Sequence, residues 1–173
     1  IQQSPGFGLD FYNDTDSRSD LRLHGDGDVR IPTDAGKLSL GASQDLQIYH
    51  DGAGSFIVDS GTGDLHIRAS DDLKFETADG SETYIVCNQN SSVDLYHDNV
   101  KTLETVNSGV KVVGPEGGSA FLYLYADEGD DNADQYWLKT EQDGTGFHIQ
   151  NNVSGSTETN LKALGNGAVE LYH

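Results

Sequence analysis

Short stretches of this 173-residue chain place an apolar residue at every second position. Strict alternation predicts β-strands with one apolar face and one wet face. No stretch of helical length shows a 3.6-residue period, so the sequence predicts an all-β fold with essentially no helix. The alternating pairs are Leu21/Leu23, Val29/Ile31, Leu38/Leu40, Leu46/Ile48, Leu65/Ile67, Leu73/Phe75, Val93/Leu95, Val110/Val112, Phe147/Ile149 and Val169/Leu171.

Glycine-containing turn signals separate these stretches. The chain has 21 glycines but only 3 prolines, which indicates many tight turns rather than a disordered chain. We expect positive φ angles at the glycines that reverse or kink a strand. The turn dipeptides are Asp26-Gly27, Asp51-Gly52, Thr62-Gly63, Asp79-Gly80, Ser108-Gly109, Asp143-Gly144 and Asn166-Gly167.

One alternating segment occurs three times and ends in a Tyr-His pair. The copies are Leu46-Gln47-Ile48-Tyr49-His50, Val93-Asp94-Leu95-Tyr96-His97 and Val169-Glu170-Leu171-Tyr172-His173. The second and third histidines are farther apart than the first and second, whereas a solenoid requires a fixed period. This spacing favours an elongated array of related β modules over a regular β-helix.

The chain is expected to divide into three segments. Residues 1–43 form a polar entry β segment, and residues 44–113 a first β module with the Tyr-His repeat. Residues 114–173 form a second module that ends in the start of a further repeat. Because the sequence begins at Ile1, we expect it to be a piece of a longer chain.

Short strands with one apolar face need a second layer. Two or three such strands do not make a stable core by themselves. The layer must come from a sandwich within the chain or from partner chains. Phe121–Tyr125 is apolar on both faces, which predicts a central strand covered on two sides. The alternative for this segment is an exposed, sugar-binding aromatic platform.

Charge excludes several classes of partner. The chain has 29 acidic against 10 basic residues, a formal net charge of −19. This balance argues against nucleic-acid binding and against docking on an anionic membrane. No apolar run reaches the ~20 residues of a membrane span, so we expect no membrane insertion. Cys87 is the single cysteine and reads as a small apolar strand residue.

The acidic segment Asp127–Asp134 is the candidate cation site. Asp130, Asn132 and Asp134 have the alternate spacing of Ca²⁺ ligands. The segment does not fit an EF-hand, because Gln135 stands at the sixth loop position, where an EF-hand requires glycine. A solvated turn and a calcium loop of another kind both remain open.

The six histidines do not form a metal motif within one chain, because none is spaced as His-x-His or His-x-x-x-His. In three parallel chains, an inward His50 or His97 would meet two copies of itself. The alternative is a histidine at a strand end that hydrogen-bonds the adjacent turn aspartate. Since Gly-x-Ser-x-Gly and phosphate-binding loops are also missing, we expect no catalytic residue, no cofactor and no enzymatic activity.

Four segments of the chain have a distinctive sequence, namely Leu40–Gly52, Ile57–Arg68, Tyr125–Asp134 and Asn160–Tyr172. These segments resemble the repeats of tail-fibre and other virion structural proteins of marine bacteriophages. The resemblance implies an elongated, parallel homotrimeric fibre of β-prism or interwoven triple β-helix type. It also implies a virion location, other tail or appendage proteins as partners, and a structural role in host-cell attachment.

Host surface glycans or receptors are further candidate partners, and both a shaft and a tip position are open for this segment. Two alternatives remain open. One is a fragment of a tailspike-type enzyme that degrades polysaccharide. The other is a fragment of a calcium-dependent bacterial adhesin.

Overall fold

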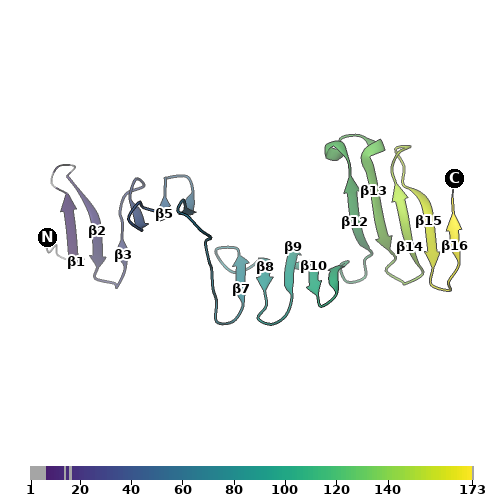
Figure 1. Ribbon diagram of the computed structural model, residues 1–173, viewed down its shortest axis with the longest axis horizontal. Coiled ribbons are helices and arrows are strands. Elements are labelled where there is room, and N and C mark those ends of the chain that lie inside the picture. The colour runs from purple at the N-terminus through teal and green to yellow at the C-terminus, as the bar shows by residue number, and fades with distance from the viewer. Residues whose placement is uncertain (1–6, 14, 16, 173) are drawn as a thin grey trace. The chain divides into compact units, whose positions relative to one another are not determined.

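A computed structural model describes residues 7–172 except 14 and 16 (Figure 1). Its strands are all antiparallel to their neighbours, and among the described residues helix is limited to two three-residue 3₁₀ turns, η1 (Asp127–Gly129) and η2 (Asn132–Asp134). The prediction of an all-β chain is therefore confirmed. No helix within this described part has the length and hydropathy to cross a membrane.

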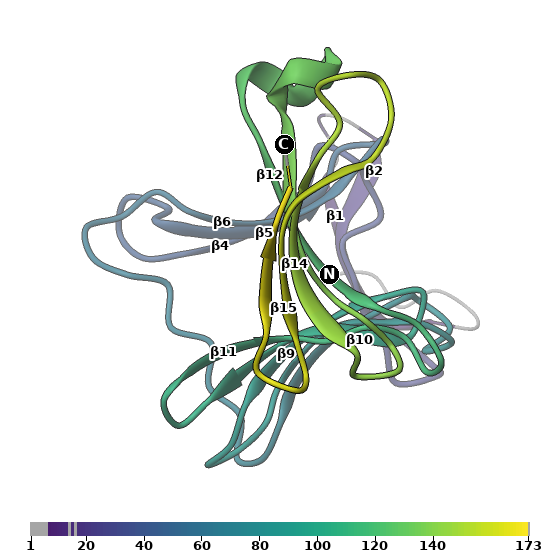
Figure 2. The ribbon, with the colours of Figure 1, turned by 90° about the vertical axis from the view of Figure 1, so that its right-hand side faces the viewer.

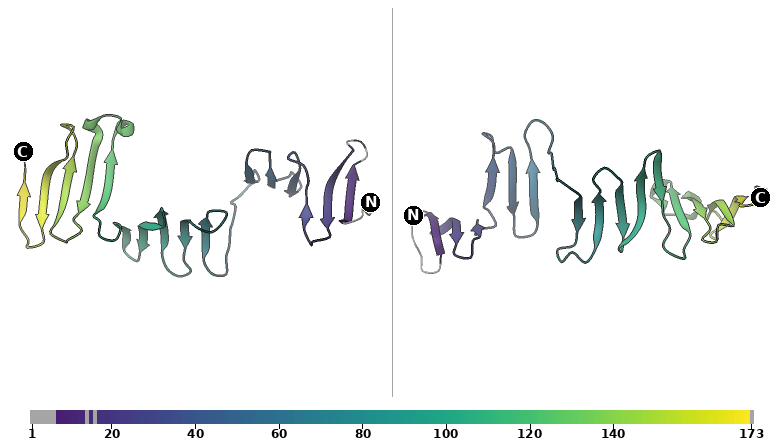
Figure 3. Two further views of the ribbon diagram at one scale, coloured as in Figure 1. Left: turned by 180° about the vertical axis from the view of Figure 1, so that it is seen from behind. Right: turned by 90° about the horizontal axis from the view of Figure 1, so that it is seen from below.

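Four sheets follow one another along the chain, and each is a simple meander that does not close into a barrel. In Figure 1 consecutive strands of each sheet lie side by side, and Figure 3 shows the same order from behind and from below. The first sheet is β1 (Phe7–Asn13), β2 (Arg18–His24) and β3 (Val29–Arg30). The second is β4 (Lys37–Leu40), β5 (Leu46–His50) and β6 (Ser55–Asp59).

The other two sheets have five strands each. The third comprises β7 (Leu73–Glu76), β8 (Thr83–Cys87), β9 (Val93–His97), β10 (Val100–Val106) and β11 (Gly109–Val112). The fourth comprises β12 (Ala120–Tyr125), β13 (Gln135–Thr140), β14 (Gly146–Asn151), β15 (Glu158–Leu164) and β16 (Val169–Leu171).

The predicted strands are confirmed with one exception. Leu65 and Ile67 alternate like the others but belong to no strand, and both are about half exposed. The two residues lie between Gly61-Thr62-Gly63 and the polar run Ser70-Asp71-Asp72, where no neighbouring strand pairs with them. Alternation alone therefore did not make a strand here.

The turn prediction is confirmed at every glycine it named. Positive φ angles occur at Gly27, Gly52, Gly63, Gly80, Gly109, Gly144 and Gly167. Between β9 and β10 the same role falls to two other residues, Asp98 (φ 52°) and Asn99 (φ 59°). Two successive positive φ angles match the right-handed twist of a hairpin, and Asn and Asp tolerate this conformation best after glycine.

The prediction for Phe121–Tyr125 is wrong in one respect. This strand, β12, lies at the edge of its sheet and pairs only with β13. Leu122, Tyr123, Leu124 and Tyr125 are each 44–55% exposed. The run of apolar residues reflects two faces that the described part of the chain leaves uncovered, rather than burial between neighbouring strands.

The chain divides into two compact units, residues 1–67 and 68–173. The expected boundary at 113/114 falls between β11 and β12, whereas the one at 43/44 falls in the turn between β4 and β5 of a single sheet. The third Tyr-His copy is described only to Tyr172, because His173 lies outside the described residues.

Little hydrophobic core forms within either unit. Among the described residues the buried hydrophobic side chains are Val86 and Trp137. Viewed along the fourth sheet, its green-to-yellow strands superimpose in one narrow layer (Figure 2). Stable domains usually bury a sheet face against a second layer, so the uncovered faces are the feature that a function must explain.

Candidate functional site: the apolar rows

Each sheet is crossed by one line of directly opposed apolar residues, one from every strand, which we call an apolar row. In the third sheet the strand register sets Phe75 opposite Ile85, Ile85 opposite Leu95, and Leu95 opposite Leu103, which is opposite Val112. Side chains directly opposite on neighbouring strands lie on the same face and touch. The row is therefore one continuous apolar band across five strands.

The other three sheets repeat this arrangement. The apolar row of the fourth sheet is Leu122, Leu138, Ile149, Leu161 and Leu171. The row of the first sheet is Leu9, Leu23 and Val29, and that of the second is Leu38, Ile48 and Ile57. None of these residues is buried, and the exposed fraction rises to 60% at Ile57 and 77% at Leu171.

The Tyr-His repeat has a structural meaning in this arrangement. The residue two positions before each histidine is Ile48, Leu95 or Leu171, and each of these belongs to the apolar row of its sheet. The repeated segment is thus the strand that carries one member of the row at a fixed position. His50 and His97 lie on the same face of their strands as the row residues, at the ends of β5 and β9.

The two histidines are exposed at these strand ends. His50 Nδ1 lies 3.1 Å from Ser55 Oγ, rather than bonding the turn aspartate as one interpretation of the sequence expected. Asp51 instead accepts hydrogen bonds from the amides of Gly54 (2.8 Å) and Ala53 (2.9 Å), which lower the pKa of its carboxyl. An axial site at His50 or His97 requires further chains and stays a prediction.

The face opposite the row carries the charges. In the third sheet Lys101 Nζ lies 3.4 Å from both Asp94 Oδ2 and Glu104 Oε2, and Lys111 Nζ lies 2.8 Å from Glu104 Oε2. The hydrogen bond from Lys111, followed by that from Lys101, lowers the pKa of Glu104. These paired charges thus lie on the face opposite the row.

The first sheet separates its faces in the same way. Asp10, on the face opposite the row, is buried and accepts a hydrogen bond of 2.8 Å from Ser19 Oγ. Arg22 donates to Ser19 Oγ at 2.8 Å, and its Nε lies 3.3 Å from Asp10 Oδ2. Polar groups that are buried need partners of this kind, and Asp10 Oδ2 finds its partners on its own face of the sheet.

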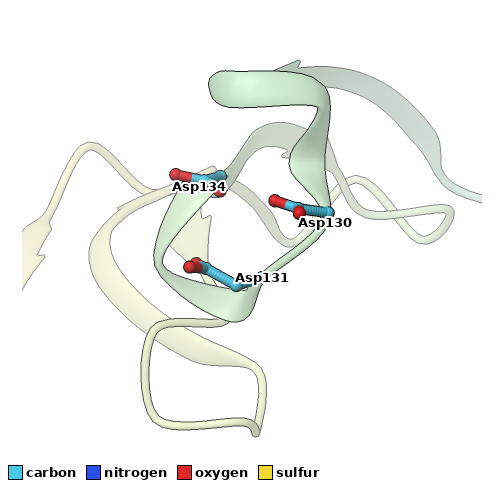
Figure 4. Close-up of side chains that lie close together, drawn as sticks. All are labelled: Asp130, Asp131 and Asp134. Atoms are coloured by element: carbon cyan, nitrogen blue, oxygen red, sulfur yellow. The ribbon is translucent and has the colours of Figure 1, made fainter.

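The acidic segment brings together three of the expected carboxylates. Figure 4 shows Asp130, Asp131 and Asp134 around one turn, with a ligand oxygen of each within 4.8 Å of the others. Asn132 does not join them, because its Oδ1 accepts a hydrogen bond from Asn152. Burial, together with the negative charges of Asp131 and Asp130, raises the pKa of Asp134.

This loop geometry is compatible with a hard cation, for which carboxylate oxygens are the preferred ligands. Hydrogen bonds within the protein also account for the conformation of this loop without a cation. Asp131 Oδ1 accepts a 2.8 Å hydrogen bond from the Ala133 amide and so caps η2. Both the solvated turn and the calcium loop expected from sequence fit these contacts.

Comparisons with models of protein families, with curated proteins and with solved structures find no match to this chain. The apolar rows and the sequence resemblance are therefore the features that bear on function. The sequence did not reveal which residues lie opposite one another on neighbouring strands. The alternating pairs signalled single strands, but the register that aligns their members into rows is visible only in the structure.

Proposed function

We propose that this chain is a structural segment of a phage tail fibre or a similar virion appendage, without enzymatic activity, in which parallel copies cover one another's apolar rows. The observation that carries the proposal is that every sheet has such a row and leaves it exposed. Fully burying one side chain of this size contributes roughly 1.5–3 kcal/mol. Rows across four sheets therefore supply a large driving force for assembly.

Further copies of the same chain are the occupant that the sheets favour. Within each unit no sheet of the described chain covers the row of another, so a sandwich inside the unit does not supply the second layer. A copy offers a row of equal length and apolar character at every sheet. Folding and assembly would then be a single event that depends on chain concentration.

The strand numbers favour a parallel arrangement of the copies. The sheets have three, three, five and five strands in chain order. An antiparallel pair would set a three-stranded sheet against a five-stranded one and leave part of the longer row uncovered. Parallel cyclic symmetry sets every row against its own copies. The number three is what the resemblance to trimeric virion fibres implies.

Charge segregation is compatible with such an assembly. The formal charge of −19 per chain would repel neighbouring copies if acidic groups lay between them. Asp94 and Glu104 instead occupy the face opposite the row, where they pair with Lys101. In the assembly these groups remain at the outer surface, and the segment acts as a rigid support for host-cell attachment.

Two adjacent residues of β8 test the proposal. Ile85 lies in the apolar row, whereas Tyr84 lies on the opposite face and is 49% exposed. Ile85→Asp would place a charge in each copy's covered interior, so we expect the assembly to dissociate. Tyr84→Asp adds the same charge to the same strand and should leave the assembly intact. Mass by light scattering measures both.

Circular dichroism of the two variants separates dissociation from loss of the strands. Equal masses for the two variants, whether both assembled or both dissociated, would contradict the proposal because the two faces of the sheet would then be equivalent.

A further inference from the structure

The face of the fourth sheet opposite its apolar row carries a strip of aromatic rings. Phe121, Tyr123 and Tyr125 alternate along β12, and Tyr123 lies directly opposite Trp137 of β13. The rings of Phe121 and Tyr123 are stacked with centroids 5.5 Å apart. Those of Tyr123 and Tyr125 are 5.7 Å apart, and Tyr123 lies 6.0 Å from Trp137. We call these four residues the aromatic strip.

The strip is only partly buried. Trp137 is 8% exposed, whereas Tyr123 and Tyr125 are 55% and 51% exposed. The buried indole has its polar group satisfied, because Nε1 donates a 2.8 Å hydrogen bond to Gln150 Oε1. Trp137 is therefore the buried member of the strip, and the two tyrosines present ring surface to solvent.

Amide side chains lie beside the strip. The rings and Gln135, Gln150, Asn152, Lys139 and Thr157 line one hollow of about 400 Å³. Asn152 Nδ2 donates to Gln135 Oε1 at 3.2 Å, and Gln150 Nε2 donates to Thr159 Oγ1 at 3.0 Å. These bonds hold the amides in place without a ligand, so the polar part of the hollow is preformed.

A flat aromatic surface next to fixed amides fits a ligand that has both an apolar face and hydrogen-bonding groups. A pyranose ring has an apolar face of C–H groups, which packs on an aromatic ring, and hydroxyls that exchange hydrogen bonds with amides. Glu170 belongs to the same sheet, Glu141 directly follows β13, and the chain carries a charge of −19. These negative charges would repel an anionic glycan, so they favour a neutral one.

We infer that the aromatic strip is a binding site for a neutral oligosaccharide. The inference rests on the proposed function in one respect, namely that the row on the opposite face of the sheet is the face covered by the other copies. The strip then lies on the outer surface, where a surface glycan can reach it. The site deepens the proposed role in attachment by giving the shaft its own contact with carbohydrate.

Trp137 provides the measurement, because it is the single tryptophan of the chain and its ring centroid lies 6.0 Å from that of Tyr123. Titration with maltohexaose, cellohexaose and chitohexaose should shift its fluorescence emission with at least one of them, and a hexauronate should give a smaller shift. Tyr123→Ala removes the exposed ring next to the indole, so we expect about tenfold weaker binding. Isothermal titration calorimetry supplies a readout independent of the tryptophan environment.

Tyr84→Ala is the matched control, since Tyr84 is an exposed tyrosine of the third sheet and should leave the affinity unchanged. Absence of binding to all three neutral oligosaccharides at millimolar concentration would overturn the inference, as would equal affinity of Tyr123→Ala and the unaltered chain. Light scattering on the same samples keeps the two proposals separate. A monomer that binds sugar contradicts the assembly alone, and an assembly that does not bind contradicts the site alone.

Discussion

Single turn residues hold the hairpins, and Asp79, between β7 and β8, is the clearest case. Its Oδ1 accepts hydrogen bonds from the hydroxyls of Thr77 and Ser81, both at 2.7 Å, and from the Ser81 amide at 3.1 Å. These bonds lower the pKa of Asp79 from 3.8 to about 2. The charged carboxylate is thus the form that stabilises the turn.

A pH dependence follows from this lowered pKa. The contribution of Asp79 is fully present above its unfolded pKa of 3.8 and is lost as the pH falls through about 2. Asp79→Asn should therefore lower the thermal midpoint at pH 7, and the difference from the unaltered chain should shrink as the pH is lowered from 4 to 2. Thermal unfolding at several pH values measures it. A difference that is independent of pH would contradict this account.

Gly114 precedes the fourth sheet at a position where the backbone approaches closely. A Cβ atom there would lie 2.6 Å from the Ser119 carbonyl oxygen and 2.8 Å from the Ala120 nitrogen. Both are backbone atoms, which cannot move aside as a flexible side chain can. We expect Gly114→Ala to destabilise the chain by about 1–3 kcal/mol, measured by urea unfolding. An unchanged midpoint would show that this segment can shift freely.

At the scale of elements, the alternating pairs predicted only some of the strands. They missed β1, β6, β8, β10, β13 and β15, which also line the apolar rows, and among these β10 and β15 carry register shifts. In β10 the register shifts between Lys101 and Leu103, and opposite β15 it shifts between Ile149 and Gln150. An extra residue at a bulge changes the face of every residue beyond it. The period-2 pattern is therefore broken in the sequence although the row is continuous in the structure.

The sequence indicated only part of the aromatic strip. The spacing of Phe121, Tyr123 and Tyr125 indicated one face of a strand, and an exposed platform was one of two interpretations. Trp137 and Gln150 belong to later strands, and only the antiparallel register of β12, β13 and β14 brings them to the strip. Sequence patterns describe one strand at a time, so a site that spans several strands needs the register.

Cys87 reports on the covered face of the third sheet. It lies opposite Leu73 and Val93 on the face of the apolar row, and it is a free, half-buried thiol within one chain. In the assembly, further copies should shield it. We expect a soluble thiol reagent to label Cys87 at least about tenfold more slowly in the native protein than in urea, because labelling requires opening.

The control for this labelling is a thiol on the other face of the same strand. Tyr84→Cys in a Cys87→Ser background places it there, and we expect rapid labelling of the native protein. Equal rates for the two thiols would mean that the face with the apolar row is as open to solvent as its opposite.

At the scale of the whole molecule, the arrangement follows from how little each unit covers by itself. Val86 and Trp137 are the buried hydrophobic residues in the described part of the chain, whereas each sheet presents an apolar row to solvent. A chain of this length ordinarily buries enough apolar surface to form its own core. Within a unit the row residues lack such cover, and in the proposed assembly identical chains in parallel provide it at all four sheets.

The mass of the unaltered chain in solution, determined by sedimentation equilibrium at micromolar concentration, tests this claim most directly. We predict a mass of three chains that persists on dilution until the protein unfolds. A well-folded species with the mass of one chain would contradict the account, because the apolar rows would then be stable in water without cover.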